Sequence, residues 1–179
     1  SFATITGNQM GALLVDYIIT AYKETDTMPH NPYVVKSIVT SELAAKVCKA
    51  NGVTIHNVLT GFKFIGEVIK NYELAGKKDG FLLGFEESYG YLLGSYARDK
   101  DAVGASMMIL EMTAYYKKLN MTLSDALEKY LNEGVSFPVA RQKAVEEISG
   151  KEFAEILSSP NNILGVEYIK GLMSINSGL

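Results

Sequence analysis

The chain has 179 residues, of which 47% are hydrophobic, and its formal net charge is −3 at pH 7. This length suits one domain, or one domain with an appendage, and allows about two thirds of the unfolded chain's surface to be buried. The weak negative charge argues against a strong non-specific nucleic-acid surface, so DNA is not an expected partner.

The sequence also limits where the protein works. No apolar stretch approaches the length of a membrane span and no signal peptide is visible, so no membrane partner is expected. The one cysteine, Cys48, has no intrachain partner and lies on the apolar side of an expected helix. This favours a buried thiol and a cytoplasmic location. Because the chain begins with Ser-Phe, we expect it to be a piece of a longer protein.

Helices and strands alternate in the first part of the chain. Apolar residues at helical spacing predict a helix from Gln9 to Lys23, after a capping turn at Thr6-Gly7-Asn8. His30 lies in the polar loop that follows, where solvent exposure is the simpler interpretation. The next elements expected are strand 33–39, helix 42–50 capped by Thr40-Ser41-Glu42, strand 53–59 with a structural His56, and helix 64–72.

Thr60-Gly61-Phe62-Lys63 joins the second strand to its helix. Backbone amides, a hydroxyl and an ammonium can together bind an anion at the amino end of a helix. A well-capped helix with a surface lysine would have the same sequence, so both interpretations stay open.

The stretch Gly84-Phe85-Glu86-Glu87-Ser88-Tyr89-Gly90 follows the apolar run Phe81-Leu82-Leu83, which predicts a buried strand. In an open α/β sheet, loops at the carboxyl ends of strands bind ligands. Carboxylates accept hydrogen bonds from hydroxyls, and serine donates or accepts, so this loop suits a polyhydroxylated ligand. A solvated turn is the alternative.

Charged residues and then helices follow this loop. Tyr91 to Tyr96 suggests a short strand or hairpin arm, and Arg98-Asp99-Lys100-Asp101 alternates in charge, as a solvated turn would. Asp101 is expected to cap a long helix, 102–119, whose methionine cluster fills the core, before a last helix at 123–131.

Short buried strands that alternate with helices predict a three-layer α/β/α fold with a mostly parallel, mixed sheet. We expect this domain to occupy residues 1–134. Residues 135–179 read as helices joined by short loops, and they predict a helical C-terminal appendage.

From about residue 4 to about residue 133, the chain resembles the third of four domains in the α-D-phosphohexomutases, the phosphoglucomutase/phosphomannomutase family. The resemblance rests on Phe85-Glu86-Glu87-Ser88-Tyr89-Gly90, in register with Arg98 to Val103, Thr60-Gly61-Phe62-Lys63 and Thr6 to Gly11. It implies an α/β/α domain in which Glu86 and Ser88 bind sugar hydroxyls. Lys100, Thr60 and Gly61 are the further substrate-binding candidates.

Residues from about 135 to 179 resemble instead a segment of the tRNA(Met) cytidine acetate ligases, whose fold is nucleotidyltransferase-like. Ser136 to Arg141 and Ser159 to Tyr168 carry this resemblance. It implies that an asparagine of the pair Asn161 and Asn162 contacts ATP. A helix cap explains the same pair, and that family's amino-terminal His motif is absent. A fused chain, or a tail that matches by chance, accounts for the two resemblances.

The resemblance implies a role in phosphoryl transfer on hexose phosphates, but the chain shows no phosphoserine loop, Asp-rich magnesium loop or phosphate-binding loop. We therefore expect a sugar-recognition domain with no catalytic residue or metal ligand, inactive alone. Hexose phosphate should bind weakly, at about −4 kcal/mol at most. Mg²⁺, glucose 1,6-bisphosphate and the remaining domains belong to the full-length family. Exposed apolar surface favours self-association. A nucleotide or tRNA-modifying module and a ligand-free structural chimera are the alternatives.

Overall fold

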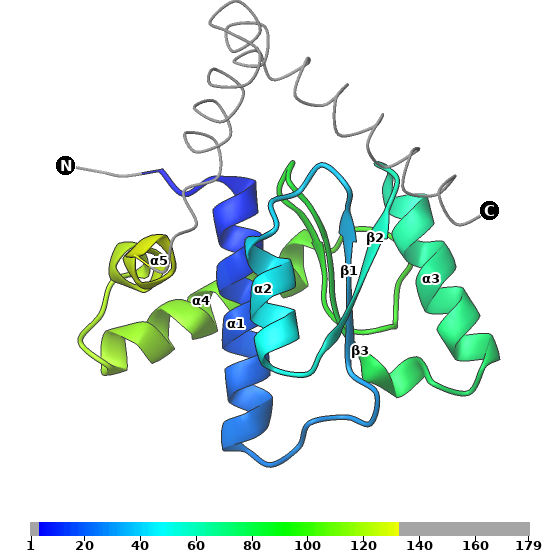
Figure 1. Cartoon of the computed structure of the whole chain (residues 1–179), viewed down its shortest axis with the longest axis horizontal. Helices are drawn as coiled ribbons and strands as arrows, with labels where there is room; N and C mark the ends of the chain where they lie inside the picture. Colours follow the sequence, from blue (N-terminus) through cyan, green and yellow to red (C-terminus); the bar gives the residue numbers. More distant parts are fainter. Residues whose placement is uncertain (1–3, 133–179) are drawn as a thin grey trace, which may run out of the picture. The chain divides into compact units, whose positions relative to one another are not determined.

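The computed structural model describes residues 4–132. The chain divides into two compact units, Ser1–Tyr130 and Leu131–Leu179, and the first contains nearly all of the described residues. The elements are α1 Gly7–Glu24, β1 Tyr33–Ser37, α2 Leu43–Ala50, β2 Thr54–Val58, α3 Phe62–Leu74, the short 3-10 helix η1 Lys78–Gly80, β3 Phe81–Glu86, β4 Gly90–Leu92, α4 Ala102–Lys118 and α5 Leu123–Asn132 (Figure 1).

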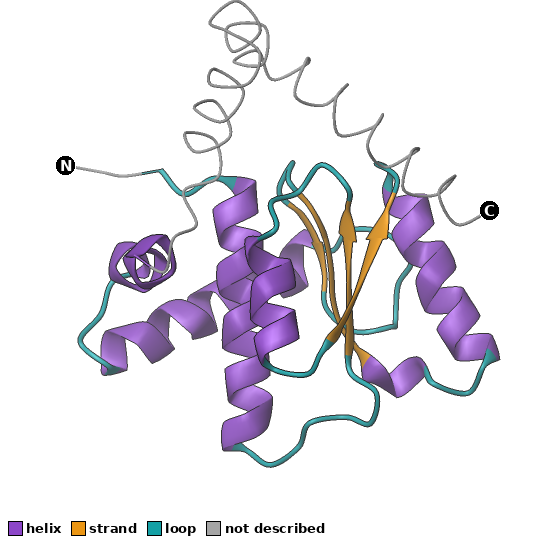
Figure 2. Ribbon diagram, in the orientation of Figure 1, coloured by secondary structure: helices purple, strands orange, loops and turns teal. Residues whose placement is uncertain are grey.

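The four strands form one mixed sheet in the order β2-β1-β3-β4. Strand β1 pairs in parallel with both β2 and β3, and β4 runs antiparallel to β3. Helices α1 and α2 lie on one side of the sheet and α3 lies on the other, so the domain has the three-layer α/β/α architecture expected from the sequence (Figure 2). Because β1, β2 and β3 are parallel, the loops that follow them meet at one edge of the sheet.

Each face of the sheet is packed against a helix at close range. On the α3 side, Tyr33, Val35, Phe81 and Leu92 pack with Phe62, Ile65 and Ile69 in one buried cluster. A Cβ added to Gly84 would lie 2.6 Å from Cγ2 of Ile65, so this glycine allows α3 to approach β3. On the other side, a Cβ added to Gly11 would lie 2.4 Å from the Phe85 ring, which brings α1 equally close.

Several local predictions are confirmed. Asp101 is the N-cap of α4, and its Oδ1 accepts a hydrogen bond from the Val103 amide at 3.0 Å. Thr6 caps α1 in a reciprocal arrangement with Gln9. Cys48 is fully buried, and burial raises the pKa of its thiol to about 12, so it is an inert core residue.

Two predictions are wrong. The N-cap of α2 is Glu42, which makes no capping hydrogen bond; its carboxylate pairs instead with the Lys36 ammonium at 3.2 Å. The methionine cluster of α4 does not fill the core as a whole, because Met112 is buried whereas Met107 is 67% exposed. The cluster lies on a helix that contacts only one edge of a four-stranded sheet, so one of its faces meets no strand.

The predicted helical appendage at 135–179 lies outside the described residues, as do Asn161 and Asn162.

Candidate functional site

Glu86 is the last residue of β3 and is only 6% exposed. Its Oε1 accepts a hydrogen bond from the Gly61 amide at 2.7 Å. Gly61 is the N-cap of α3 and has φ of +120°, a conformation that favours glycine. One carboxylate therefore joins the end of β3 to the start of α3, at the sheet edge where the parallel strands end.

Lys100 lies beside the same carboxylate, with Gly90 between them. A Cβ added to Gly90 would lie 2.8 Å from Cδ of Lys100 and 3.6 Å from Oε2 of Glu86. The Lys100 ammonium is 5.2 Å from the centre of the Phe62 ring and 2.7 Å from Oδ1 of Asp99. Hydrogen bonds from Lys100 lower the pKa of Asp99. The aliphatic part of the Lys100 side chain and a buried carboxylate thus flank one glycine.

Hydrogen bonds to other segments of the chain anchor the turn between β3 and β4. Glu87 accepts a hydrogen bond from the hydroxyl of Ser37, at the end of β1, at 2.8 Å. The Tyr89 hydroxyl donates to the Ile5 carbonyl at 3.0 Å. The backbone of Tyr89 has φ of +63°, in the left-handed region. Between these anchors the Ser88 side chain is exposed. The turn therefore presents its serine outward on a fixed backbone.

Thr60 and Gly61 lie at the amino end of α3, as the sequence predicted. The Gly61 amide has a hydrogen-bond partner within the protein, whereas the Thr60 hydroxyl has none among the described residues. The Gly61 amide already binds Glu86. The Thr60 hydroxyl is buried and has no hydrogen-bond partner among the described residues. Lys63 lies over the Phe64 ring, 4.9 Å from its centre. The amino end of α3 is thus neutralised by a carboxylate of the protein itself.

Sequence reasoning missed two side chains at this edge. Lys36 is fully buried on β1 and donates to the Thr40 carbonyl and to Glu42, each at 3.2 Å. Ser37 is also fully buried and supports Glu87. A lysine inside an otherwise apolar strand was the available signal, because such a residue needs a polar partner in the fold.

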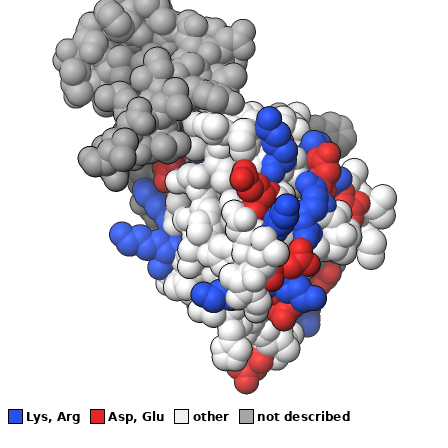
Figure 3. Space-filling view, turned by 90° about the vertical axis from the view of Figure 1, so that its right-hand side faces the viewer, with Lys and Arg blue, Asp and Glu red and all other residues white. Residues whose placement is uncertain are grey.

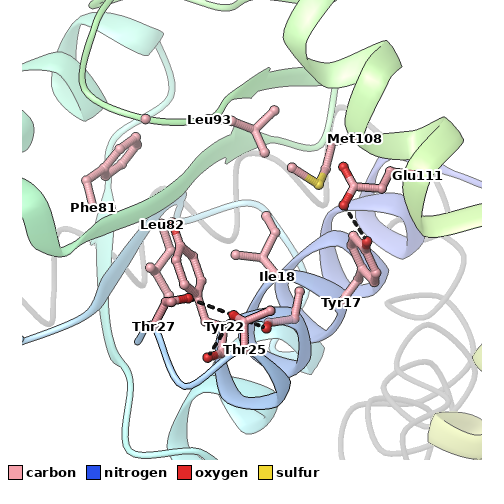
Figure 4. A pocket seen from close by; sticks show the side chains of 12 residues that line it. Tyr17, Ile18, Tyr22, Thr25, Thr27, Phe81, Leu82, Leu93, Met108 and Glu111 are labelled. Atoms are coloured by element: carbon pink, nitrogen blue, oxygen red, sulfur yellow. Dashed lines mark hydrogen bonds between the residues drawn. The ribbon is translucent and has the colours of Figure 1, made fainter. Parts of the chain in front are cut away.

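Hollows elsewhere do not contain the predicted substrate residues. A cavity of about 240 Å³ lies between α1, the start of β3 and α4, where Tyr17 donates to Glu111 at 2.9 Å beside Ile18, Leu82, Leu93 and Met108 (Figure 4). A second hollow is lined by Lys63, Phe64, Gly66, Glu67, Lys70 and Arg98. Figure 3 shows Lys and Arg side chains interleaved with Asp and Glu over one face of the molecule, so that face carries no extended patch of one charge.

Among residues 4–132, no cluster of three or more His, Cys, Asp or Glu side chains could hold a metal ion. Over the same residues, no helix is both long enough and apolar enough to cross a membrane.

Comparison with known families agrees with this fold. The family profile "Phosphoglucomutase/phosphomannomutase, alpha/beta/alpha domain III" matches residues 6–133. The fold and this match define the class: an α/β/α domain of the phosphohexomutase type. The chain belongs to the phosphoglucomutase/phosphomannomutase family. A second profile, "HIGH Nucleotidyl Transferase", matches residues 104–179 and so overlaps the end of the first.

Individual relatives point the same way. A phosphoglucomutase of Staphylococcus haemolyticus is 36% identical over 127 residues, 71% of this chain and 22% of the relative. A phosphoglucomutase of Staphylococcus aureus strain MRSA252 is 34% identical over 167 residues, 93% of this chain and 29% of the relative. The structure of parafusin, a phosphoglucomutase from Paramecium, has a TM-score of 0.52 and 25% identity over 70% of this chain and 20% of its own.

The chain spans about a quarter of the length of the curated relatives. The alignment with the Staphylococcus aureus protein covers 167 residues and so runs past residue 133. The family profile ends at residue 133, as expected from the sequence, and this pairwise alignment continues beyond it. The two family matches are consistent with a chain that combines segments of both kinds.

Proposed function

We propose that this domain recognises the sugar of a hexose phosphate, as one wall of a phosphohexomutase cleft. The observation that supports it is the arrangement of Glu86 and Lys100 around Gly90, at the sheet edge where parallel strands end. Oε1 of Glu86 is bound to Gly61, and no hydrogen bond within residues 4–132 uses Oε2. A sugar hydroxyl can donate to that oxygen.

Ser88 and Lys100 complete the proposed contacts. The exposed Ser88 hydroxyl donates to or accepts from a second sugar hydroxyl, on a turn that Glu87 and Tyr89 hold in place. The Lys100 side chain is about half exposed, and its ammonium donates to a hydroxyl or a phosphate oxygen. Thr60 offers a buried hydroxyl with no partner in the described part of the chain, close to Gly61.

The proposed role is recognition without chemistry. Phosphoryl transfer depends on a positioned nucleophile and on neutralisation of developing charge. The resemblance assigns the phosphoserine, the Mg²⁺ site and the site for the second phosphate to other domains of the family. We therefore expect no mutase activity from this chain alone, and weak binding of glucose 1,6-bisphosphate, in the millimolar range.

An amide NMR titration of the full chain with glucose 1,6-bisphosphate tests the proposal. We expect shifts at Thr60, Gly61 and residues 86–100, reduced in Ser88→Ala and in Lys100→Ala. Both side chains are exposed, so these variants leave the core intact. Lys70→Ala is the matched control, because Lys70 is an exposed lysine of α3 outside the proposed contacts. Absence of shifts at high millimolar ligand, or equal losses in the control, would refute sugar recognition.

The profile match at residues 104–179 supports a second candidate, a nucleotide-binding segment. Asn161 and Asn162 are its proposed ATP contacts. ATP titrated into the same labelled chain should shift resonances of residues 159–168, and Asn161→Ala should abolish the shifts. Flat titrations with ATP and hexose phosphate would instead favour a chimera without a ligand.

A further inference from the structure

The turn between β3 and β4 consists of Glu87, Ser88 and Tyr89, since Glu86 and Gly90 on either side are paired. Hairpin turns of this length usually place a glycine at the last turn position, because that position takes a left-handed conformation. Here the position is occupied by Tyr89, with φ of +63°. This conformation is unfavourable for a bulky side chain. The residues of the turn therefore do not favour its conformation by themselves, and contacts from outside the turn hold it.

These outside contacts come from α1 and β1. A Cβ added to Gly7, at the start of α1, would lie 1.9 Å from the Glu87 carbonyl oxygen, so the backbone of the turn lies directly against this helix. The Tyr89 hydroxyl donates to the carbonyl two residues before α1. The Ser37 hydroxyl, at the end of β1, donates to Oε2 of Glu87 at 2.8 Å. The contacts thus anchor both neighbours of Ser88.

Ser37 is itself firmly held by the loop that follows β1. It is fully buried, and its carbonyl accepts hydrogen bonds from the amide and the hydroxyl of Thr40 at 3.1 and 2.6 Å. The Thr40 carbonyl in turn accepts from Nζ of Lys36, also fully buried, at 3.2 Å. The loop therefore closes around Ser37, and its hydroxyl is a fixed anchor for Glu87.

We propose that Ser37 is a positioning residue for sugar recognition, which acts through Glu87 to fix Ser88 before a ligand binds. The inference rests on the proposed function of the turn. Ser37 itself touches no sugar, because it is fully buried. A side chain that is already ordered does not lose that freedom on binding, which is worth about two- to tenfold in affinity. Loss of the Ser37 hydroxyl should remove this gain.

Titration of the full chain with glucose 1,6-bisphosphate, followed by amide NMR, tests this role. Ser37→Ala should weaken binding by about two- to tenfold. In a chain that already carries Ser88→Ala, the same substitution should change the affinity little, because the side chain that Ser37 positions is absent. Glu87→Ala should weaken binding as Ser37→Ala does, and it leaves the core intact because Glu87 is partly exposed. Glu87→Gln keeps an acceptor oxygen and should lose less.

Tyr72→Phe is the control for a general loss of stability. It removes a 2.8 Å hydrogen bond between the Tyr72 hydroxyl and His56, neither of which belongs to the turn, and it should bind the ligand as the unmodified chain does. Relaxation of ¹⁵N gives a second measurement that needs no ligand. The order parameter of the Ser88 amide should fall in Ser37→Ala and stay unchanged in Tyr72→Phe.

The outcomes separate this inference from the proposed function. If the unmodified chain binds the ligand and Ser37→Ala binds it equally well, the role of Ser37 is overturned while sugar recognition stands. An equal loss of affinity with and without Ser88→Ala would also overturn it, because Ser37 would then not act through Ser88. Absence of shifts in the unmodified chain would refute sugar recognition itself, and this inference with it.

Discussion

Replacing Glu86 by alanine should destabilise the domain, because the carboxylate holds the start of α3 to the end of β3. The variant removes the oxygen that accepts a hydrogen bond from the Gly61 amide at 2.7 Å. Water cannot easily replace this acceptor, because Glu86 is only 6% exposed. A hydrogen bond to a charged group is worth about 1.5–3 kcal/mol. We expect the free energy of unfolding to fall by about 2 kcal/mol.

Urea unfolding followed by far-UV circular dichroism measures this loss, since the chain has no tryptophan. Glu86→Gln keeps an oxygen acceptor for Gly61 and should lose under about 1 kcal/mol, because only the charge is removed. Glu67→Ala, at an exposed position of α3, is the control and should lose least. Equal losses for Glu86→Ala and Glu67→Ala would show that the carboxylate does not support α3.

Four further outcomes are expected from the core. Tyr33→Phe should leave stability unchanged or raise it by up to about 1 kcal/mol in urea unfolding, because the buried Tyr33 hydroxyl has no partner among the described residues. Tyr72→Phe should lower stability by about 1 kcal/mol, since its hydroxyl is 2.8 Å from Nε2 of His56. Gly84→Ala should cost about 1–3 kcal/mol through the clash with Ile65, and Ile65→Ala in the same chain should relieve part of it. Burial lowers the pKa of His56 below 6.5, so the unfolded chain takes up a proton that the folded chain resists. The free energy of unfolding should therefore fall as pH drops below about 6.5, and above this pH it should not depend on His56. Urea unfolding at pH 7.5 and at pH 5.5 measures this loss. The part of the loss that comes from His56 should be absent in His56→Gln.

The alternation of helices and strands was predictable because the spacing of apolar residues within each segment indicates its secondary structure. Strand β1 is an uninterrupted buried run, and α1 repeats apolar residues at helical spacing, so each element is identified by its own residues. The Asp101 cap is equally local, since its partner Val103 is two residues away. Such features need no knowledge of which strands become neighbours.

The errors arise where burial depends on neighbours distant in the sequence. Hydrophobicity predicted a buried methionine cluster, yet the sheet ends at β4 and only the inward face of α4, with Met112, reaches the core. Lys36 lies inside the predicted strand 33–39, but its partners could not be predicted, because Glu42 and the Thr40 carbonyl come close only when the chain turns after β1. The periodicity of a segment gives its faces but not what covers them.

The candidate site depends both on residue types, which the sequence shows, and on side-chain contacts, which only the structure shows. The residue types in the turn suggested a hydroxyl-binding loop, but only the structure shows that the two oxygens of Glu86 differ, with Oε1 bound to Gly61 and Oε2 toward Gly90. A single carboxylate thus supports α3 and faces the proposed ligand. It follows that loss of sugar binding in Glu86→Ala alone would not separate recognition from folding. Ser88→Ala and Lys100→Ala do separate them, because these exposed side chains leave the Glu86–Gly61 hydrogen bond in place. Loss of binding in those variants, with unfolding unchanged, would assign recognition to the side chains themselves.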